Sequence, residues 1–451
     1  MHYDIIIIGG GAAGLMAAYG ARTATSKKPS VLVLEKMPRP GRKIMITGKG
    51  RCNFTNVKGW NDFSTHVKSN SKALRPSFYN LPPERLLEFF DMAGLESVVE
   101  RGDRAFPKSH KSMDVVDALT DAAVRSGARI ETEKEVTEVN AEDTGFIITT
   151  SDSAKYSASR LIVATGGLSY PSTGSTGDGY RIAERMGHSI RQCFPSLTAV
   201  VPKGYKMIPD GYRADMKCHL DRSLPLSDMG VALCGNSLKN IGLHLYAGGT
   251  EIQEADGDID FTDGGIEGPA GFNISRNAVK TMVNGGKVKI SIDLKPGVPE
   301  EEFSDRVSKL WKDILDDRRS AGKPVRQSVK ILLGKLMPMD LIPGFMKCHP
   351  EIISGPKGRE MLKQKALVNA VRRWEFEIDG YVGYERCVIT AGGISCEEIV
   401  PKTLASRKCP GLYFCGEVLD IDADTGGYNL HIAFSTGLLA GRSAALSLED
   451  A

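Results

Sequence analysis

The sequence is 451 residues long, which predicts about three domains, and its 41% hydrophobic and 25% charged residues are typical of a globular protein. The net charge of +3, with acidic and basic residues interspersed, gives no indication of a nucleic-acid or membrane partner. The nine cysteines form no CxxC pair or zinc-type spacing, and we expect neither a signal peptide nor a membrane-spanning run, so we predict a cytoplasmic protein without disulfides or a bound metal.

The first predicted unit is a strand, a tight turn and a helix that begin at Asp4. Ile5 to Ile8 form an apolar, β-branched run typical of a strand buried in a parallel sheet, and three spaced glycines follow. Gly9 permits the turn, Gly11 lets the backbone approach a pyrophosphate, and Gly14 lets the helix pack against the strand. This spacing predicts a dinucleotide-binding unit.

A second strand completes this unit. Val31 to Leu34 are apolar, and Glu35 follows at the position where an acid accepts hydrogen bonds from the hydroxyls of an adenosine ribose. The helix between the strands starts at Ala12 and Ala13, with its positive end toward the phosphates. Because strand, glycines, helix, strand and acid occur in order, an incidental glycine turn is a poor explanation.

The next stretch, residues 36–56, is a second glycine-containing loop that is rich in hydrogen-bond donors. We predict that it lies over the cofactor, and the alternative is a solvated basic loop. Cys52 stands alone and cannot form a redox pair within the chain, so we interpret it as buried or unreactive rather than redox-active. The predicted contacts from this stretch are Lys36, Arg42, Lys43, Thr47, Gly50, Arg51, Cys52 and Asn53.

The following segment is predicted to alternate helices and short strands. Residues 82–90 have the pattern of a short helix introduced by two prolines, 101–107 that of a turn-rich link, and 113–124 that of a helix capped by Ser112. Residues 130–161 predict a meander of short strands. A buried strand then ends at Thr165, Gly166 and Gly167, where we expect the chain to return to the nucleotide sheet, and a helix over 180–186 follows.

A β-rich inserted domain is predicted to begin near residue 189. Its candidate strands are 194–202, 218–220, 231–234, 243–246, 252–253 and 288–292. Residues 261–270 form a glycine-rich turn that opens a helix, but no strand and acid stand at the offsets of a second dinucleotide site. Residues 299–361 are predicted to be helical, with a core stripe formed by Phe303, Val307, Leu310, Trp311, Ile314 and Leu315. We interpret a nearby basic face, Lys323, Arg326, Lys330 and Lys335, as solvated surface.

The C-terminal region predicts a return to the cofactor. Residues 387–391 and 411–420 have the pattern of strands, the second with acids at its end, and a glycine turn at 425–429 opens a helix over 430–446. A nicotinamide cofactor does not need such a distant return, whereas the ribitol and ring of FAD do. We predict ribitol or pyrophosphate contacts from Glu417 or Asp420, and helix-end amides facing the flavin. The predicted contacts are Thr165, Gly166, Gly167, Gly416, Glu417, Asp420, Gly427, Tyr428 and Asn429.

These motifs resemble those of the bacterial YhiN/BaiN-type flavoproteins, a family that includes aminoacetone oxidases and flavin reductases of unsaturated bile-acid intermediates. The resemblance covers nearly the whole chain. Its most specific part is GRKIMITGKGRCNFTN at 41–56, and the blocks at 100–119, 164–180, 265–270 and 411–437 are also similar. Lys49, Ala423 and His431 depart from the common pattern; none lies at a predicted pyrophosphate or ribose contact.

The resemblance implies an α/β fold in which a Rossmann-type, glutathione-reductase-like FAD-binding domain is interrupted by a β-rich domain with a small helical insert. The expected boundaries are 1–188 and 388–451 for the FAD-binding domain, 189–298 and 366–387 for the β-rich domain, and 299–365 for the helical domain. Within this fold, His431 is more readily explained as a structural residue than as one near the flavin ring.

The function that we expect is an FAD-dependent oxidoreductase that acts on a small organic substrate by hydride transfer. NAD(P)H is the candidate electron donor, without a Rossmann domain of its own, and oxygen is the alternative acceptor. Cys52, Asn53, Tyr428 and His431 are weak catalytic candidates. The alternatives are a flavin-dependent tRNA-modifying enzyme, which calls for a concentrated basic surface, and a non-catalytic flavin-binding sensor. The sequence leaves the oligomeric state open.

Overall fold

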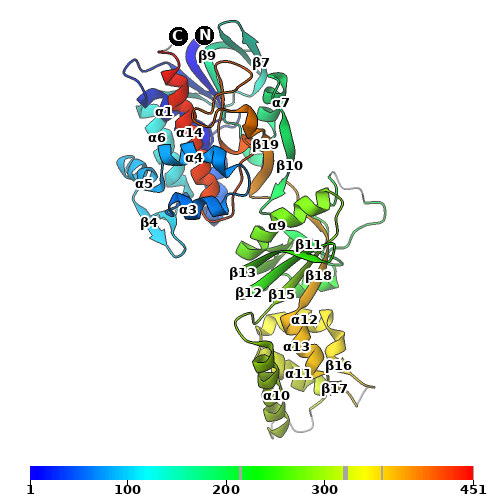
Figure 1. The fold of residues 1–451 in the computed structure, drawn as a ribbon. Helices are drawn as coiled ribbons and strands as arrows, with labels where there is room; N and C mark the ends of the chain where they lie inside the picture. Colours follow the sequence, from blue (N-terminus) through cyan, green and yellow to red (C-terminus); the bar gives the residue numbers. More distant parts are fainter. Residues whose placement is uncertain (213–215, 318–322, 357–358, 450–451) are drawn as a thin grey trace. The chain divides into compact units, whose positions relative to one another are not determined.

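The computed structural model describes residues 1–451 except 213–215, 318–322, 357–358 and 450–451. Its contacts divide the chain into two compact units, Met1–Pro195 with Tyr384–Ala451, and Ser196–Gly383 (Figure 1). The first unit contains the whole of the predicted FAD-binding domain, and the second contains most of the β-rich domain and the whole helical segment. The separate status of 299–365 stays a prediction.

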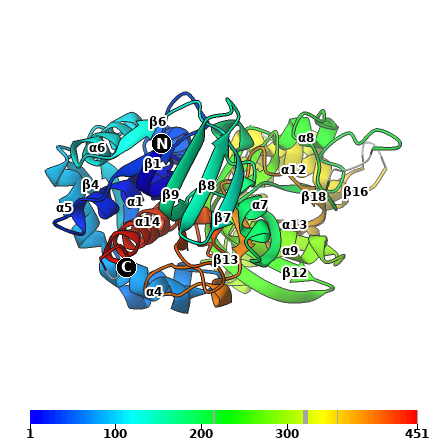
Figure 2. The same ribbon diagram turned by 90° about the horizontal axis from the view of Figure 1, so that it is seen from above.

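The first unit is built on a seven-stranded sheet whose centre is parallel, as predicted. Its main order is β6-β2-β1-β9-β8-β7, and β20 also pairs with β9 (Figure 2). The last residues of β9 pair with β20 in parallel, while its first residues pair with β8 in antiparallel. The strands are β1 (His2–Ile8), β2 (Val31–Leu34), β6 (Arg129–Glu131), β7 (Val136–Glu142), β8 (Gly145–Thr150), β9 (Lys155–Val163) and β20 (Leu412–Phe414).

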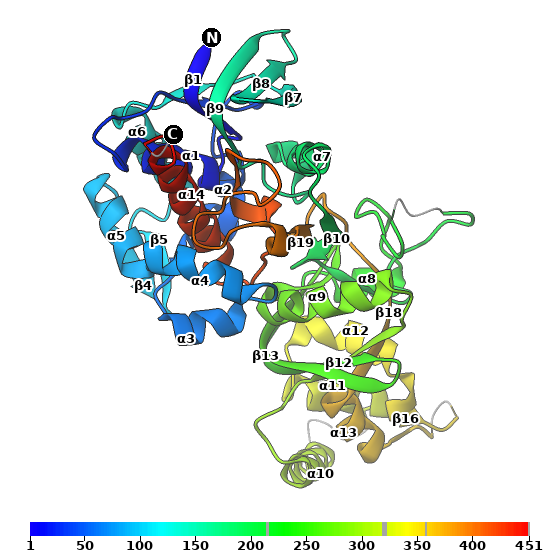
Figure 3. The same ribbon diagram turned by 45° about the horizontal axis from the view of Figure 1, so that its top comes forward.

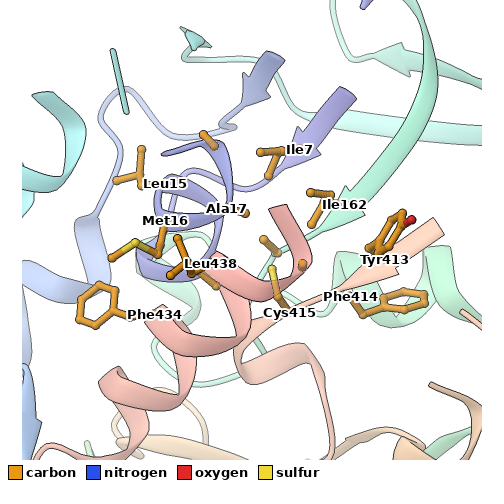
Figure 4. Close-up of a cluster of buried hydrophobic side chains, with 14 of the residues drawn as sticks. Ile7, Leu15, Met16, Ala17, Ile162, Tyr413, Phe414, Cys415, Phe434 and Leu438 are labelled. Carbon is orange, nitrogen blue, oxygen red and sulfur yellow. The ribbon is translucent and has the colours of Figure 1, made fainter. Parts of the chain in front are cut away.

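Two long helices, α1 (Ala12–Thr23) and α14 (Tyr428–Leu446), pack against each other in this unit (Figure 3). Figure 4 shows Leu15 of α1 and Leu438 of α14 in one apolar cluster with Ile7 and Ile162 of the sheet. The close crossing depends on glycine: a Cβ atom at Gly441 would lie 2.0 Å from the carbonyl oxygen of Ala17. The helices α1 and α14, which lie more than 400 positions apart in the sequence, therefore pack directly against each other.

The remaining helices of the first unit surround this core. They are α2 (Arg42–Ile46), α3 (Trp60–Phe63), α4 (Ser71–Asn80), α5 (Pro83–Met92), α6 (Ser112–Arg125) and α7 (Asp178–Arg185), with short 3₁₀ helices at 47–50, 64–66, 171–173, 396–398 and 416–418. The predicted cap of α6 is wrong, because Ser112 is its first helical residue and donates a hydrogen bond to the carbonyl of Met45.

Two small sheets complete the first unit. One contains β3 (Thr55–Asn56), β5 (Arg104–Pro107) and β4 (Ser97–Glu100), and the other contains β10 (Ile190–Ser196) and β19 (Ile389–Ile394). The turn-rich link predicted at 101–107 is therefore wrong for its second half. Residues 104–107 form a strand because they pair with strands on both sides, and such pairing is not visible in local sequence.

The second unit is built around a closed six-stranded barrel, against which α9 (Gly268–Val283) packs. The strands are β11 (Val200–Pro202), β14 (Gly265–Glu267), β13 (Thr250–Thr262), β12 (Ser237–Ala247), β15 (Val288–Asp293) and β18 (Trp374–Tyr381). Two strand predictions are wrong. Residues 231–233 lie in α8 (Asp228–Leu233), which Ser227 caps by accepting two backbone hydrogen bonds, and His219 forms only an isolated bridge.

The helical part of the second unit contains α10 (Glu300–Asp316), α11 (Val325–Gly334), α12 (Ile342–Cys348) and α13 (Gln364–Arg372), as well as the short pair β16 (Ile353–Ser354) and β17 (Met361–Leu362), and 3₁₀ turns at 339–341 and 350–352. Phe303, Val307 and Ile314 bury the predicted core face of α10, but Leu315 is exposed. Among the described residues, no helix combines the length and apolarity needed to cross a membrane.

Candidate functional site

The glycine turn after β1 leaves room for a ligand at one of its three glycines. Gly9 has φ +104°, and a Cβ atom there would lie 2.5 Å from the carbonyl oxygen of Ala164; a Cβ at Gly14 would lie 1.8 Å from the oxygen of Gly9. Gly11, the N-cap of α1, has ordinary extended backbone angles, and a Cβ there would meet nothing within 4 Å. The fold therefore requires Gly9 and Gly14, whereas only a ligand would require Gly11.

The α1 N-terminus adds backbone donors beside this space. Ala12 and Ala13 open the helix, which has twelve residues and no side-chain cap, so that its first amides remain available to an anion. Ala13 is buried, and a Cβ at Gly416 would lie 2.8 Å from its Cβ, which brings the segment after β20 against the same turn.

Glu35 lies at the end of β2 beside the glycine turn. Its Oε2 accepts a hydrogen bond from the amide of Gly10 at 2.7 Å, and its Oε1 accepts one from the amide of Met37 at 2.8 Å. Burial raises the pKa of the carboxyl group, and the two amides oppose this shift. Lys36 instead pairs with Asp178 at 2.6 Å, so its side chain is already engaged.

Two buried polar atoms of residues 36–56 have no hydrogen-bond partner among the described residues: Nε of Arg42, whose neighbour Gly41 donates to the carbonyl of Gly10 in the glycine turn, and Oδ1 of Asn53, which lies beside Gly427. Buried polar atoms are rarely left unpaired in a native protein. A guanidinium donor suits a phosphate, and an amide oxygen suits a ring N–H. Both atoms therefore fit a nucleotide cofactor that would lie across them.

Lys43 and Glu417 form an ion pair of 2.9 Å that joins α2 to the segment after β20. Glu417 also accepts hydrogen bonds from the hydroxyl of Ser169 and the amide of Thr390. The turn at 165–167 lies beside this cluster: a Cβ at Gly167 would lie 2.6 Å from the Thr390 hydroxyl. Thr165 and Gly166 belong to that turn, and their cofactor contacts stay predictions, as does that of Glu417.

The other predicted contacts around these segments have protein partners. Asp420 accepts a hydrogen bond from Asn70, and Asn429 bonds both the amide and the carbonyl of Ala423. Arg51 pairs with Glu100 and lies over the Phe106 ring, and the Thr47 hydroxyl donates to the carbonyl of Ile44. Gly50 has φ +85° and open space at its Cβ position. Arg51, Asn429 and Asp420 thus shape the surrounding loops.

The N-terminus of α14 lies against the loop that contains Asn53. Gly427 has φ +97°, and a Cβ there would lie 2.5 Å from the backbone of Thr55 and 2.8 Å from Oδ1 of Asn53. Tyr428 follows as the first helical residue and is buried. The helix end and the unpaired amide oxygen of Asn53 therefore lie together, and their contacts with a flavin stay predictions.

Three residues near Tyr428 were not singled out from the sequence. The ring of His66 stacks on that of Tyr428 with 4.4 Å between centroids, and its Nδ1 lies 3.1 Å from Oδ2 of Asp424. Lys68 also pairs with Asp424, at 2.8 Å. Since 358 positions separate His66 from Asp424, no local pattern could have indicated this cluster.

His431 has the position of a structural histidine. Its ring is fully buried among Phe63 and Phe78, and its Nδ1 lies 2.9 Å from the Thr55 hydroxyl. Burial lowers the pKa of the ring to about 3, so it stays neutral. We no longer propose a catalytic role for it.

Cys52 is fully buried, and burial raises the pKa of its thiol to about 12. Because the thiolate is the reactive form, we expect the native protein not to be alkylated at Cys52 by iodoacetamide at pH 8. We expect Cys52→Ser to retain FAD and a reducible flavin, as measured by absorbance and anaerobic reduction. Loss of reducibility in Cys52→Ser would contradict this, and the partly exposed Cys218 and Cys234 serve as internal controls for alkylation.

Glu35→Ala should weaken FAD binding by about 1.5–3 kcal/mol, because the variant removes a charged acceptor from the ribose position. The measurement is a titration of apoprotein with FAD, followed by flavin fluorescence. Glu96→Ala, at an exposed surface pair with Lys108, is the control and should bind FAD normally. An unchanged dissociation constant for Glu35→Ala would remove Glu35 from the site.

Comparisons with known proteins identify the family of the chain. Residues 3–443 match the family model of the HI0933-like protein Rossmann domain. The chain is 31% identical to the 3-dehydro-bile acid delta(4,6)-reductase of Clostridium scindens, over 97% of this chain and 98% of the relative. It is 31% identical to the ribosomal RNA dihydrouridine synthase of Haemophilus influenzae and 27% identical to that of Escherichia coli, over 96% of each chain.

The residues present fit FAD: there is open space over Gly11, a helix end at Ala12, an acid at Glu35, and unpartnered polar atoms on Arg42 and Asn53. The match to the family model covers nearly the entire chain. The predicted resemblance and cofactor class are therefore confirmed at the level of the family. The chain belongs to the HI0933-like Rossmann family and is an FAD-dependent oxidoreductase.

Proposed function

We propose that the protein reduces a carbon–carbon double bond that is conjugated to a carbonyl group. The observation that carries this proposal is the pair of 31% identical relatives, whose names describe one kind of chemistry on different molecules. A delta(4,6) double-bond system beside a 3-oxo group is conjugated to it, and forming dihydrouridine saturates the bond conjugated to a uracil carbonyl. In either reaction, each double bond that is reduced takes up one hydride and one proton.

FAD, when bound, supplies hydride chemistry, and the protein supplies binding and electrostatics. Gly11, the α1 amides, Glu35 and Arg42 would hold the dinucleotide end. The α14 N-terminus has a partial positive charge, which favours negative charge on a reduced ring. Tyr428 is our candidate proton donor: burial, followed by the charges of Asp62 and Asp424, raises the pKa of its hydroxyl, which therefore stays protonated.

The first candidate substrate is a small conjugated ketone, which belongs to the class of small organic substrates that we expected from the sequence. The second is a uracil base in RNA, favoured by the two relatives named ribosomal RNA dihydrouridine synthases. The expectation that the protein has no nucleic-acid partner is therefore not confirmed.

The first test is anaerobic stopped-flow reduction of the FAD-loaded protein by NADH and by NADPH. We expect a pyridine nucleotide to bleach the flavin, and a conjugated acceptor to reoxidise it faster than air does. Slow bleaching by both nucleotides, with rapid reoxidation by air after chemical reduction, would instead identify an oxidase and overturn the proposal.

The two substrates are separated by a second experiment. The loaded protein and its reductant are incubated either with a 3-oxo-Δ4 steroid or with deproteinised ribosomal RNA that lacks dihydrouridine. Mass spectrometry then detects a gain of two hydrogens in the steroid or in a uridine. Tyr428→Phe serves as the matched variant, with normal reduction of the flavin and slower reduction of the substrate.

A further inference from the structure

The segment 323–373 concentrates positive charge. It contains eleven Lys and Arg residues but three Asp and Glu, a net charge of +8 in a chain whose total is +3. The rest of the chain is therefore net negative. The net charge of the whole chain gives no sign of this positive segment, because the negative charge of the remaining residues offsets most of it.

On α11, the basic residues lie on the exposed face of the helix. Val329, Leu332 and Leu333 are buried, whereas Arg326 and Lys330 are exposed. Because they are four positions apart, these two side chains are neighbours on that face. Lys323 precedes the helix and Lys335 follows it, and both are also exposed.

The neighbouring β17 continues this basic region. β17 packs against α11 and pairs with β16 (Figure 1). Arg359 lies before β17, and Lys363 and Lys365 lie after it, all exposed. We define the basic surface as Lys323, Arg326, Lys330, Lys335, Arg359, Lys363 and Lys365.

The charges of the basic surface are not neutralised by the described part of the protein. Three other basic residues of the segment have partners: Lys347 pairs with Asp228, Arg372 with Asp293, and Arg373 with Glu300, while Lys357 lies outside the described residues. None of the seven side chains of the basic surface forms an ion pair or hydrogen bond with a described residue. Like charges held this close repel each other, and a polyanion that covers them would relieve the repulsion.

The helix α10 of the same unit differs from the basic surface in the charges of its exposed residues. Its exposed Lys309 and Lys312 stand among Asp305, Asp313 and Asp316, so this helix presents both signs of charge. Positive charge is thus not a general property of the exposed helices in this unit.

We propose that the basic surface binds the phosphate backbone of a folded RNA. The proposal rests on the second candidate function, the reduction of a uracil base in RNA, and names the surface that would hold that substrate. A phosphate backbone carries regularly spaced charges, and Lys and Arg gain affinity from it by releasing its counterions. This replaces our interpretation of Lys323, Arg326, Lys330 and Lys335 as merely solvated.

The test uses the FAD-loaded full chain and deproteinised ribosomal RNA in a filter-binding assay at several salt concentrations. The variant is Arg326→Gln/Lys330→Gln, and the matched control is Lys309→Gln/Lys312→Gln on α10. Both remove two exposed positive charges from one helix face. Flavin reduction by the effective donor should be normal in both proteins, because none of these residues belongs to the FAD site.

We expect the Arg326→Gln/Lys330→Gln variant to weaken RNA binding and to reduce the slope of log Kobs against log salt by about two, roughly one for each removed cation. The control should keep the affinity and slope of the unchanged protein. Equal losses in both variants, or no loss in either, would overturn the basic surface as the binding site. Displacement of the RNA by polyglutamate at equal charge concentration would also overturn it, in favour of an acidic protein partner.

The two experiments test RNA binding by the basic surface separately from reduction of a uracil base in RNA. Salt-sensitive RNA binding that requires Arg326 and Lys330, without dihydrouridine formation, would support the surface and reject the RNA substrate. Dihydrouridine formation that proceeds equally in the variant and the control would support the substrate and overturn the surface.

Discussion

Gly11→Val should weaken FAD binding by roughly 150-fold while leaving the apoprotein folded. The backbone at Gly11 has φ −81° and ψ −169°, angles that a β-branched residue adopts, and the space beside it is empty. The added side chain would fill the space through which we expect the pyrophosphate to approach the α1 amides. A steric conflict of this kind costs about 3 kcal/mol, or roughly 150-fold in the dissociation constant.

The measurement combines an FAD titration with thermal unfolding of the apoproteins. Gly14→Ala should instead destabilise the apoprotein itself. Its added Cβ atom would lie 1.8 Å from the carbonyl oxygen of Gly9 within the fold. Gly59→Ala, where the methyl group meets nothing within 4 Å, should change neither property. If Gly11→Val binds FAD normally, the pyrophosphate does not lie over this turn.

Gly441→Ala should destabilise the first unit, although helix propensity alone predicts the reverse. Within a helix, alanine is more favourable than glycine by about 1 kcal/mol. Here, however, the added Cβ would lie 2.0 Å from the carbonyl oxygen of Ala17, so α1 and α14 would have to move apart. We expect a net loss of about 2–3 kcal/mol, or a fall of roughly 5–10 °C in the unfolding temperature.

This result would be measured by thermal unfolding of the apoprotein, with Gly59→Ala as the control in the same unit. Gly437→Ala should behave like Gly441→Ala, since its Cβ would lie 2.3 Å from the carbonyl oxygen of Ala13. A stabilising effect of Gly441→Ala would mean that the helices cross less closely than the structure has them.

Much of the dinucleotide-binding unit was predictable from the sequence, because the residues that specify it lie close together in the chain. Ile5 to Ile8, the glycine spacing and Glu35 specify strand, turn and acid within a short stretch, and the structure has these elements at the predicted positions. The polar contacts were less predictable. Lys36 pairs with Asp178, 142 positions away, and Lys43 pairs with Glu417, 374 positions away, so their partners depended on the fold.

The sequence by itself determined the dinucleotide-binding unit, the β-rich character of 189–298 and the helical character of 299–361, because hydrophobic periodicity and turn residues act over a few positions. Only the tertiary structure decided the strand at 104–107, the helix at 228–233 and the close crossing of α1 with α14. For the strand and the helix crossing, the deciding interaction is backbone pairing or packing between segments that are far apart in the chain. The helix at 228–233 begins at a local cap, Ser227, which our reading of the sequence overlooked. Four residues of the basic surface were visible in the sequence as a basic face, and only the contact between α11 and β17 adds Arg359, Lys363 and Lys365 to them.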